Sequence, residues 1–413
     1  MQSPTRSTRW TTLALLLLLL QAAACTRKKS DGLRHAPRTT KQLPTTAAAI
    51  WLGNLDAQID ALEGRAAGPD LYVLSAAHHL RGRYRGDLDE IQHGIDLLAC
   101  TTDAACFQSR ADQEQSLHRF GAAEADLRHA SQLGATKTAA LQADLDWNAG
   151  RYAAAIPAIR AARAAHPTTG TWIREAQLEH ELGDEHAADV AYEKAEDAVT
   201  DTGPLVVAHL NVQRGMQKVD TGRLDEAAVF FRAAVERMPD WVTANEHLAE
   251  VLAMDGKDDE ALRIYERVVG LSDDPEFAHA LAELYAKRGR ADEAKALTEK
   301  SRARYEVLLA KYPEAMYWHA SEFFLAVGDA PRAVDLLTKN VALRPNSTSL
   351  VALAKAKLAA HQDARAEIDR ALAMPPVSAR LFWTASKVYA GTPEAEAFTR
   401  RAKAMNPRVA ADE

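Results

Sequence analysis

The stretch GRLDEAAVFFRAAVERMPDW, residues 222–241, contains the pattern on which this chain is built. It begins with a glycine, continues with a small residue at Ala227 and a large apolar residue at Phe231, and ends soon after Pro239. The stretch GKDDEALRIYERVV, residues 256–269, repeats the first half of this pattern at the same offsets. Apolar residues four apart lie on one face of a helix, and proline cannot continue a helix. Each copy therefore predicts a helix that follows a glycine turn.

The pattern recurs along the chain at intervals of 33 to 39 residues. The turn glycines are Gly150, Gly183, Gly222, Gly256, Gly289 and Gly328. Five positions later comes a small residue, at Ala155, Ala188, Ala227, Ala261, Ala294 and Ala333. A period near 34 with two helices per copy resembles the tetratricopeptide repeat (TPR) family. The resemblance implies an all-α fold, a superhelical solenoid of stacked antiparallel helix hairpins over residues 136–407. Residues 46–135 are expected to form degenerate hairpins or an N-terminal cap, and residues 408–413 a tail.

Residues 1–24 resemble the signal peptide of a bacterial lipoprotein. Basic residues precede a short apolar run, and small residues lead directly to Cys25. The resemblance implies that Cys25 is acylated and becomes the mature N-terminus, although Ala22 stands where leucine is most usual. Arg27 occupies the position at which aspartate retains such proteins in the inner membrane. We therefore expect a lipid anchor in the outer membrane, facing the periplasm. The alternative is cleavage after Ala24, which leaves a soluble periplasmic protein.

Charge is divided unevenly along the chain. The first 45 residues carry eight Lys or Arg and one Asp, a formal charge of +7. Since the whole chain has a formal charge of −7, residues 46–413 carry −14. Residues 25–45 are therefore expected to form a flexible basic tether. An acidic body argues against a nucleic-acid partner, because nucleic-acid binding needs a basic surface.

The three cysteines form an odd number, which fits lipidation of one of them. If Cys25 carries lipid, Cys100 and Cys106 remain as a pair in a compartment that permits disulfides. We expect a disulfide between them; the alternative is two free cysteines in the core.

We find no pattern of catalytic residues: there is no Gly-x-Ser-x-Gly, no phosphate-binding glycine loop and no His-Glu-x-x-His. The adjacent His78 and His79 point to different faces of a helix, so we expect one packed and one solvated histidine. The sequence therefore predicts neither an enzyme nor a bound metal or cofactor. A non-catalytic subunit of an enzyme complex remains as an alternative.

Function in such an array is expected on the first helix of each copy. The position six residues before a turn glycine lies opposite the core face and is acidic in four copies, at Asp144, Glu250, Glu283 and Glu322. On the same side we expect His247, His279, His319, Trp147 and Trp318. This acidic groove with histidines and tryptophans would suit a basic or amphipathic segment of a protein partner. The alternative is that the acidic row is only a solvated face.

These patterns together predict a non-catalytic envelope lipoprotein. We expect it to act as a protein-interaction scaffold, adaptor or assembly factor. The alternative is a soluble periplasmic repeat protein that acts as a chaperone or carrier.

Overall fold

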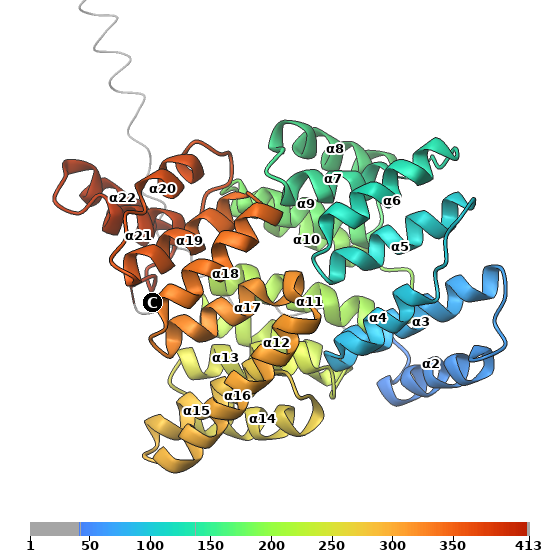
Figure 1. Ribbon diagram of the computed structural model, residues 1–413, viewed down its shortest axis with the longest axis horizontal. Coiled ribbons are helices and arrows are strands. Elements are labelled where there is room, and N and C mark those ends of the chain that lie inside the picture. Colours follow the sequence, from blue (N-terminus) through green and yellow to red (C-terminus); the bar gives the residue numbers. More distant parts are fainter. Residues whose placement is uncertain (1–40, 42, 137, 411–413) are drawn as a thin grey trace, which may run out of the picture. The chain divides into compact units, whose positions relative to one another are not determined.

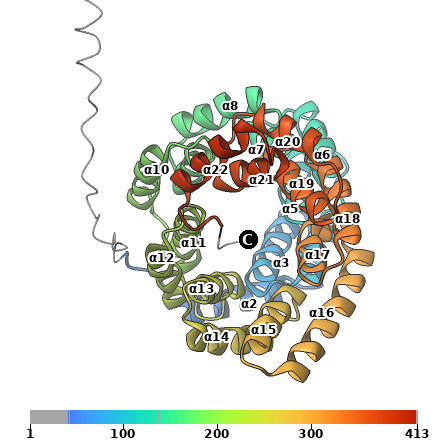
Figure 2. The ribbon, with the colours of Figure 1, turned by 90° about the vertical axis from the view of Figure 1, so that its left-hand side faces the viewer.

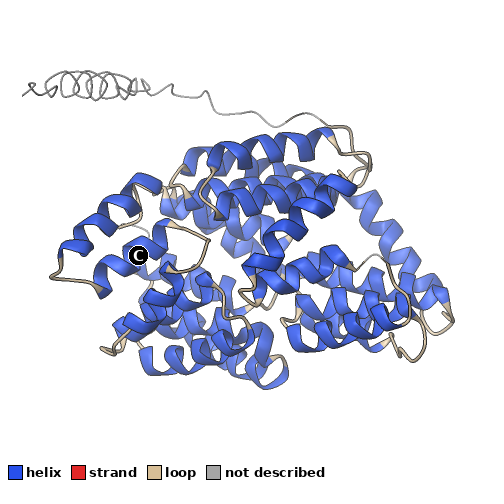
Figure 3. Ribbon diagram, turned by 90° about the horizontal axis from the view of Figure 1, so that it is seen from above, coloured by secondary structure: helices blue, strands red, loops and turns tan. Residues whose placement is uncertain are grey.

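The computed structural model describes residues 41, 43–136 and 138–410, all within the unit Thr39–Glu413. The signal peptide, Cys25 and most of the tether lie outside the described residues. All regular structure in the described part is helical (Figure 3). Among these residues, no helix combines the length and the apolar character needed to cross a membrane.

Twenty-one helices follow one another in the described part. The first, α2 (Ala48–Leu62), precedes a series of antiparallel pairs. The pairs are α3 (Pro69–Arg85) with α4 (Leu88–Asp96), α5 (Ala104–Ser116) with α6 (Phe120–Gln132), α7 (Ala139–Asn148) with α8 (Tyr152–Ala165), α9 (Thr169–Glu181) with α10 (Glu185–Asp197), α11 (Pro204–Asp220) with α12 (Leu224–Arg237), α13 (Val242–Met254) with α14 (Asp258–Leu271), α15 (Pro275–Lys287) with α16 (Ala291–Lys311), α17 (Pro313–Ala326) with α18 (Ala330–Leu343), α19 (Ser347–Ala359) with α20 (Arg365–Leu372), and α21 (Ala379–Val388) with α22 (Pro393–Met405). The predicted all-α solenoid of stacked hairpins is confirmed.

The pattern residues have the roles that their chemistry predicts. Gly222 and Gly256 adopt φ angles of 72° and 77°, a left-handed conformation that glycine adopts without strain. Ala227 and Ala261 are fully buried, because their small side chains allow the two helices of a hairpin to approach closely. Phe231 is buried beside them and fills the space between neighbouring hairpins.

Residues 46–135 continue the series of hairpins, and here the helices α3 and α4 approach each other closely at two glycines. A Cβ atom on Gly82 would lie 2.7 Å from Cγ1 of Ile91, and one on Gly94 would lie 2.8 Å from the carbonyl oxygen of Ser75. Glycine at these two positions thus lets α3 and α4 pack together without side chains between them. A disulfide between Cys100 and Cys106 closes the loop that leads into α5.

The superhelix of this unit returns upon itself, so that late hairpins contact early ones (Figure 1). The backbone amide of Ser347 donates a 2.9 Å hydrogen bond to Oη of Tyr152, which begins α8. The amide of Val377 donates likewise to the carbonyl of Glu181, at 2.8 Å. Lys311 at the end of α16 pairs with Asp89 of α4 at 2.7 Å. These contacts add long-range packing to an array in which most contacts join neighbours.

Candidate functional site

The inner side of the ring of helices is formed by the first helix of each hairpin in this region. Figure 2 shows α13, α15 and α17 on the inner side and α12, α14, α16 and α18 outside them. Six titratable side chains of the three inner helices make up what we call the acidic–histidine cluster. Its members are Glu246, His247, Glu250, Glu276, His319 and Glu322.

The cluster consists of two triads, each with one histidine and two carboxylates. In the first, Nδ1 of His247 lies 2.9 Å from Oε2 of Glu246 and 3.4 Å from Oε2 of Glu250. In the second, Nδ1 of His319 lies 2.9 Å from Oε2 of Glu276, and Glu322 completes the group. Glu276 comes from α15 and the other two from α17, so this triad joins neighbouring hairpins.

Aromatic residues of the core hold the histidines of this region in place. The ring of His247 stacks on Phe231 of the outer helix α12, with 5.4 Å between the centroids. His279 of α15 packs edge-on against Phe323 of α17 at 4.8 Å. Because both aromatic rings are buried, the histidine positions are fixed by core packing and not only by their carboxylate partners.

Several groups in and beside the cluster have shifted pKa values. Burial alone would lower the pKa of His319, but the attraction and hydrogen bond of Glu276 raise it to about 9. Burial raises the pKa of Glu246 to about 7. Burial and repulsion from Glu276 raise the pKa of Asp274, just before α15, to about 6. Yet the His319 side chain remains 39% exposed.

The carboxylates of the cluster lack strong cationic partners within the protein. Among the described residues, their ion pairs are with histidines and none is with Lys or Arg. On the outer helices, by contrast, Glu260 pairs with Arg232 and Asp259 with Arg288. Burial raises the pKa of Glu246 and Glu322, whereas the attraction of His319 lowers that of Glu276 against the effect of burial. A bound cation would stabilise the charged forms of Glu246 and Glu322. The arrangement therefore suits a cationic ligand.

Most of the predicted groove residues belong to the inner helices α13, α15 and α17. Glu283 is exposed on α15 and lies 3.5 Å from Nε2 of His279. Trp318 is half-buried on α17, and the guanidinium of Arg344 lies 5.6 Å from the centroid of its ring. Asp144 is exposed in part but already pairs with Arg174, at 2.5 Å.

The placement of Trp147 in the groove is wrong. Its side chain is only 7% exposed and packs edge-on against Tyr152 in the core between α7 and α8. The reason is helical geometry: Trp147 lies four residues after Ala143, which is buried in the same core cluster, so it falls on the packed face of α7. Among the described residues, the tryptophan nearest the acidic–histidine cluster in sequence is Trp318.

Two cluster members, Glu246 and Glu276, were missed in the sequence. Glu246 directly precedes His247 and is buried in α13. Glu276 lies in the first turn of α15, three residues before His279, and this spacing places both on one helix face. That spacing was the available signal for Glu276.

The adjacent histidines of α3 differ from expectation in one respect. His78 is the packed member of the pair, but His79 is half-buried and not solvated, and its Nε2 lies 2.8 Å from Oγ of Ser116. Burial lowers the pKa of His79 to about 4, which makes this imidazole a weak base.

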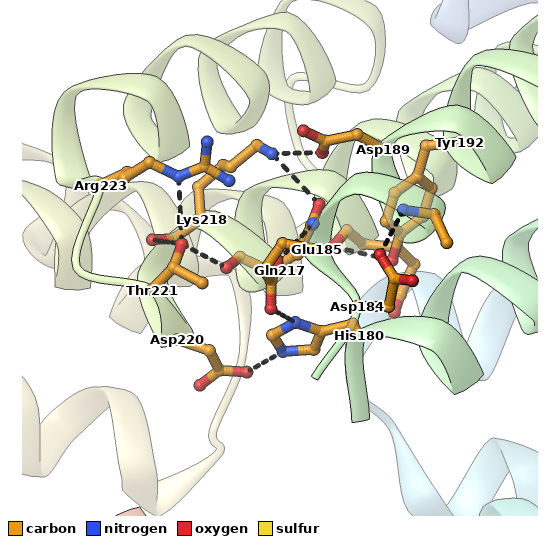
Figure 4. Close-up of polar contacts among 12 residues, drawn as sticks. His180, Asp184, Glu185, Asp189, Tyr192, Gln217, Lys218, Asp220, Thr221 and Arg223 are labelled. Atoms are coloured by element: carbon orange, nitrogen blue, oxygen red, sulfur yellow. Dashed lines mark hydrogen bonds and ion pairs between the residues drawn. The ribbon is translucent and has the colours of Figure 1, made fainter. Parts of the chain in front are cut away.

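A second polar network, between α9, α10 and α11, contrasts with the cluster because its charges are paired internally (Figure 4). His180 lies between Glu185 and Asp220, and these carboxylates raise its pKa to about 10 against the effect of burial. Lys218 is 2% exposed and donates to Asp189 at 2.5 Å. Such mutual pairing of buried charges indicates a structural role.

Comparison with known proteins yields similarity at the level of fold. No protein-family model and no curated protein matches the sequence. Human IFIT1, solved as a dimer with PPP-AAAA, is 14% identical, with 90% of this chain and 96% of that chain covered and a TM-score of 0.44. A tetratricopeptide repeat protein from Parabacteroides merdae is 15% identical over 57% of this chain and 93% of its own, with a TM-score of 0.34. PilW, a type IV pilus biogenesis factor, is 20% identical over 50% and 94%, with a TM-score of 0.35. The order and packing of the helices themselves define the fold as an α-solenoid of stacked hairpins.

Proposed function

We propose that this protein is a non-catalytic scaffold that binds a basic segment of a protein partner across the acidic–histidine cluster. One observation carries the proposal: within the described residues, the carboxylates of the cluster have histidine partners but no Lys or Arg partner. A Lys- or Arg-rich segment would supply the missing cations, and electrostatic complementarity of this kind governs partner choice and association rate.

The spacing of the inner helices favours a polypeptide over a small cation. The cluster extends over α13, α15 and α17, the first helices of three successive hairpins. Packed helices lie roughly 10 Å apart, and an extended chain covers this distance in about three residues. A segment with a basic residue at every third position would therefore place one cation near each inner helix. The acidic charge of the body favours such a partner over a nucleic acid.

The cellular setting is part of the same proposal. The protein would act as an adaptor or assembly factor in a bacterial envelope, attached by lipid on Cys25 to the outer membrane and facing the periplasm. The Cys100–Cys106 disulfide supports export, because disulfides persist in oxidising compartments.

The test is a titration with a labelled 15-residue peptide that carries lysine at every third position. We compare the wild-type protein with an inner variant, Glu250→Gln/Glu283→Gln/Glu322→Gln. The inner variant should bind at least about tenfold more weakly, a loss of about 1.4 kcal/mol. Wild-type binding should also tighten between pH 6 and pH 8, because Glu246, whose pKa is about 7, loses its proton over this range.

A matched outer variant distinguishes an effect of the proposed site from an effect of the protein's net charge. Asp225→Asn/Asp259→Asn/Glu396→Gln changes the formal charge equally, at exposed carboxylates on α12, α14 and α22. We expect its affinity to stay near that of the wild type. Equal losses in the two variants would mean that the peptide responds to overall charge, and the proposed site would be wrong.

A further inference from the structure

Three helices bring two imidazoles and a carboxylate together outside the acidic–histidine cluster. Glu63 directly follows α2, His78 lies in α3 and His93 in α4. Nε2 of His78 lies 2.9 Å from Oε2 of Glu63, and Nε2 of His93 lies 3.6 Å from Oε1 of the same carboxylate. The two imidazole rings meet edge to face, with 4.6 Å between their centroids. One ligand atom from each residue lies within 4.8 Å of those of the other two.

A fourth residue orients the buried histidine. Nδ1 of His78 lies 3.2 Å from Oε1 of Glu90 of α4, whose side chain is 9% exposed. Arg81 donates its Nε–H to the same oxygen and an Nη1–H to Asp56, at 3.0 Å. Glu90 can therefore accept a hydrogen bond from Nδ1 of His78, which leaves Nε2 of His78 directed toward Glu63. A carboxylate behind the imidazole is the usual companion of a metal-bound histidine.

The fold holds this arrangement rigidly. The glycine contacts at Gly82 and Gly94 bring α3 and α4 close enough for His78 and His93 to meet. Oγ of Ser75 also accepts a hydrogen bond from Gln113 of α5, at 2.7 Å, and donates one to the carbonyl of Gly94, at 2.6 Å. Glu63 directly follows α2, which packs on α3 through a small apolar cluster, and its carboxylate contacts both His78 and His93.

We propose that Glu63, His78 and His93 bind one transition-metal ion, with Zn²⁺ as the ion that suits the donors best, and that the ion fastens α2 to the α3–α4 hairpin. Two imidazoles with one carboxylate select borderline metals such as Zn²⁺ over Mg²⁺ or Ca²⁺, which prefer oxygen ligands. Ligand atoms about 2.0–2.2 Å from a tetrahedral zinc ion lie about 3.3–3.6 Å from one another. In the protein, the separation of 2.9 Å is shorter than this range and that of 3.6 Å lies at its upper limit. The two distances end on different oxygens of Glu63, so the half-exposed carboxylate would turn to offer one oxygen to the ion.

The site has room for a further ligand. The side chains of Glu63 and His93 are each about half exposed, whereas His78 closes the inner side of the site. Three protein ligands leave a tetrahedral zinc ion with one free position, which water or a partner's side chain would occupy. The ion would thus join α2, the first helix of the described array, to the rest of the solenoid.

The test uses the full chain after removal of metal with a chelator. Zn²⁺ is titrated in competition with a chromophoric chelator, and Co²⁺ is titrated to detect the visible absorption of a tetrahedral site. We expect one equivalent bound with at least micromolar affinity in the wild type. His93→Ala should weaken binding of that equivalent at least tenfold and abolish the cobalt absorption. In the wild type, zinc should also slow hydrogen exchange in residues 48–62, and His93→Ala should lose this protection.

His93 is suited to this test because it is exposed, so its removal leaves the fold intact without metal. His186→Ala, at an exposed histidine of α10, is the matched control and should bind zinc as the wild type does. Glu63→Gln should behave like His93→Ala, since an amide is a poor zinc ligand. Absence of binding in the wild type, or equal zinc affinity in the wild type and His93→Ala, would overturn the proposal. The second outcome would place any bound zinc in the acidic–histidine cluster or elsewhere.

Discussion

Glu196→Ala should lower the unfolding free energy of the region around α10 and α11 by about 3–5 kcal/mol. Glu196 and Arg214 form an ion pair in which each side chain is only 6% exposed, with 3.3 Å between Oε2 and Nη1. The guanidinium of Arg214 also stacks on Phe230, at 4.5 Å from the ring centroid. Removal of the carboxylate leaves a buried cation without its partner. Urea denaturation and hydrogen exchange of residues 185–220 measure the loss.

A double variant distinguishes the lost charge from lost packing. Glu196→Leu/Arg214→Met removes both charges and retains side-chain volume, so it should recover most of the stability. If the double variant is no more stable than Glu196→Ala, the effect does not come from the unpaired charge. The backbone amide of Lys41 also donates to Glu196, at 2.9 Å, so both variants should loosen the segment before α2 equally.

Phe231→Ala should lower the local unfolding free energy by about 3–5 kcal/mol and disturb the acidic–histidine cluster as well. Phe231 is 1% exposed and fills the space beside Gly215, where a Cβ atom would lie 2.4 Å from its ring. Its other side supports the imidazole of His247. In a solenoid each hairpin contacts mainly its neighbours, so faster hydrogen exchange should concentrate in residues 204–271.

The matched control for Phe231 removes an exposed apolar side chain of the same region. Leu271→Ala, at the end of α14, should change stability by less than about 0.5 kcal/mol because Leu271 is exposed. Uniform loss of protection across the described array after Phe231→Ala would contradict the local account of stability. The protein would then unfold as one cooperative core.

The hairpins could be predicted from sequence because their determinants are local. A turn glycine such as Gly256 must adopt a left-handed φ, and an alanine such as Ala261 must fit where two helices cross. Each requirement restricts one position of the repeat to a particular residue type, and these positions recur at a fixed offset. The same locality explains why Glu250 and Glu283 could be predicted to lie on a face of their helices away from the core, and both side chains are exposed.

The contacts between distant hairpins could not be predicted in the same way. The hydrogen bond from Ser347 to Tyr152 depends on the sum of small rotations between many successive hairpins. The group of Glu63, His78 and His93 likewise draws one residue from each of three helices, at no spacing that a known metal motif shares. Trp147 shows that prediction can also fail within one helix. A shift of one position turns a side chain by about 100° around the helix axis, which is enough to move it from an exposed face to the core.

Site-specific photo-crosslinking tests the central claim, that the inner surface binds a basic segment of a partner, most directly. A benzophenone amino acid replaces Glu283 of the inner helix α15 or, as the control, Asp259 of the outer helix α14; both positions are exposed. After irradiation in cells that produce the protein naturally, mass spectrometry identifies the segment attached to each position. The account predicts adducts from position 283 to a partner segment rich in Lys or Arg, and few from position 259. Adducts from position 259 alone, or attachment of position 283 to acidic or neutral segments, would contradict it.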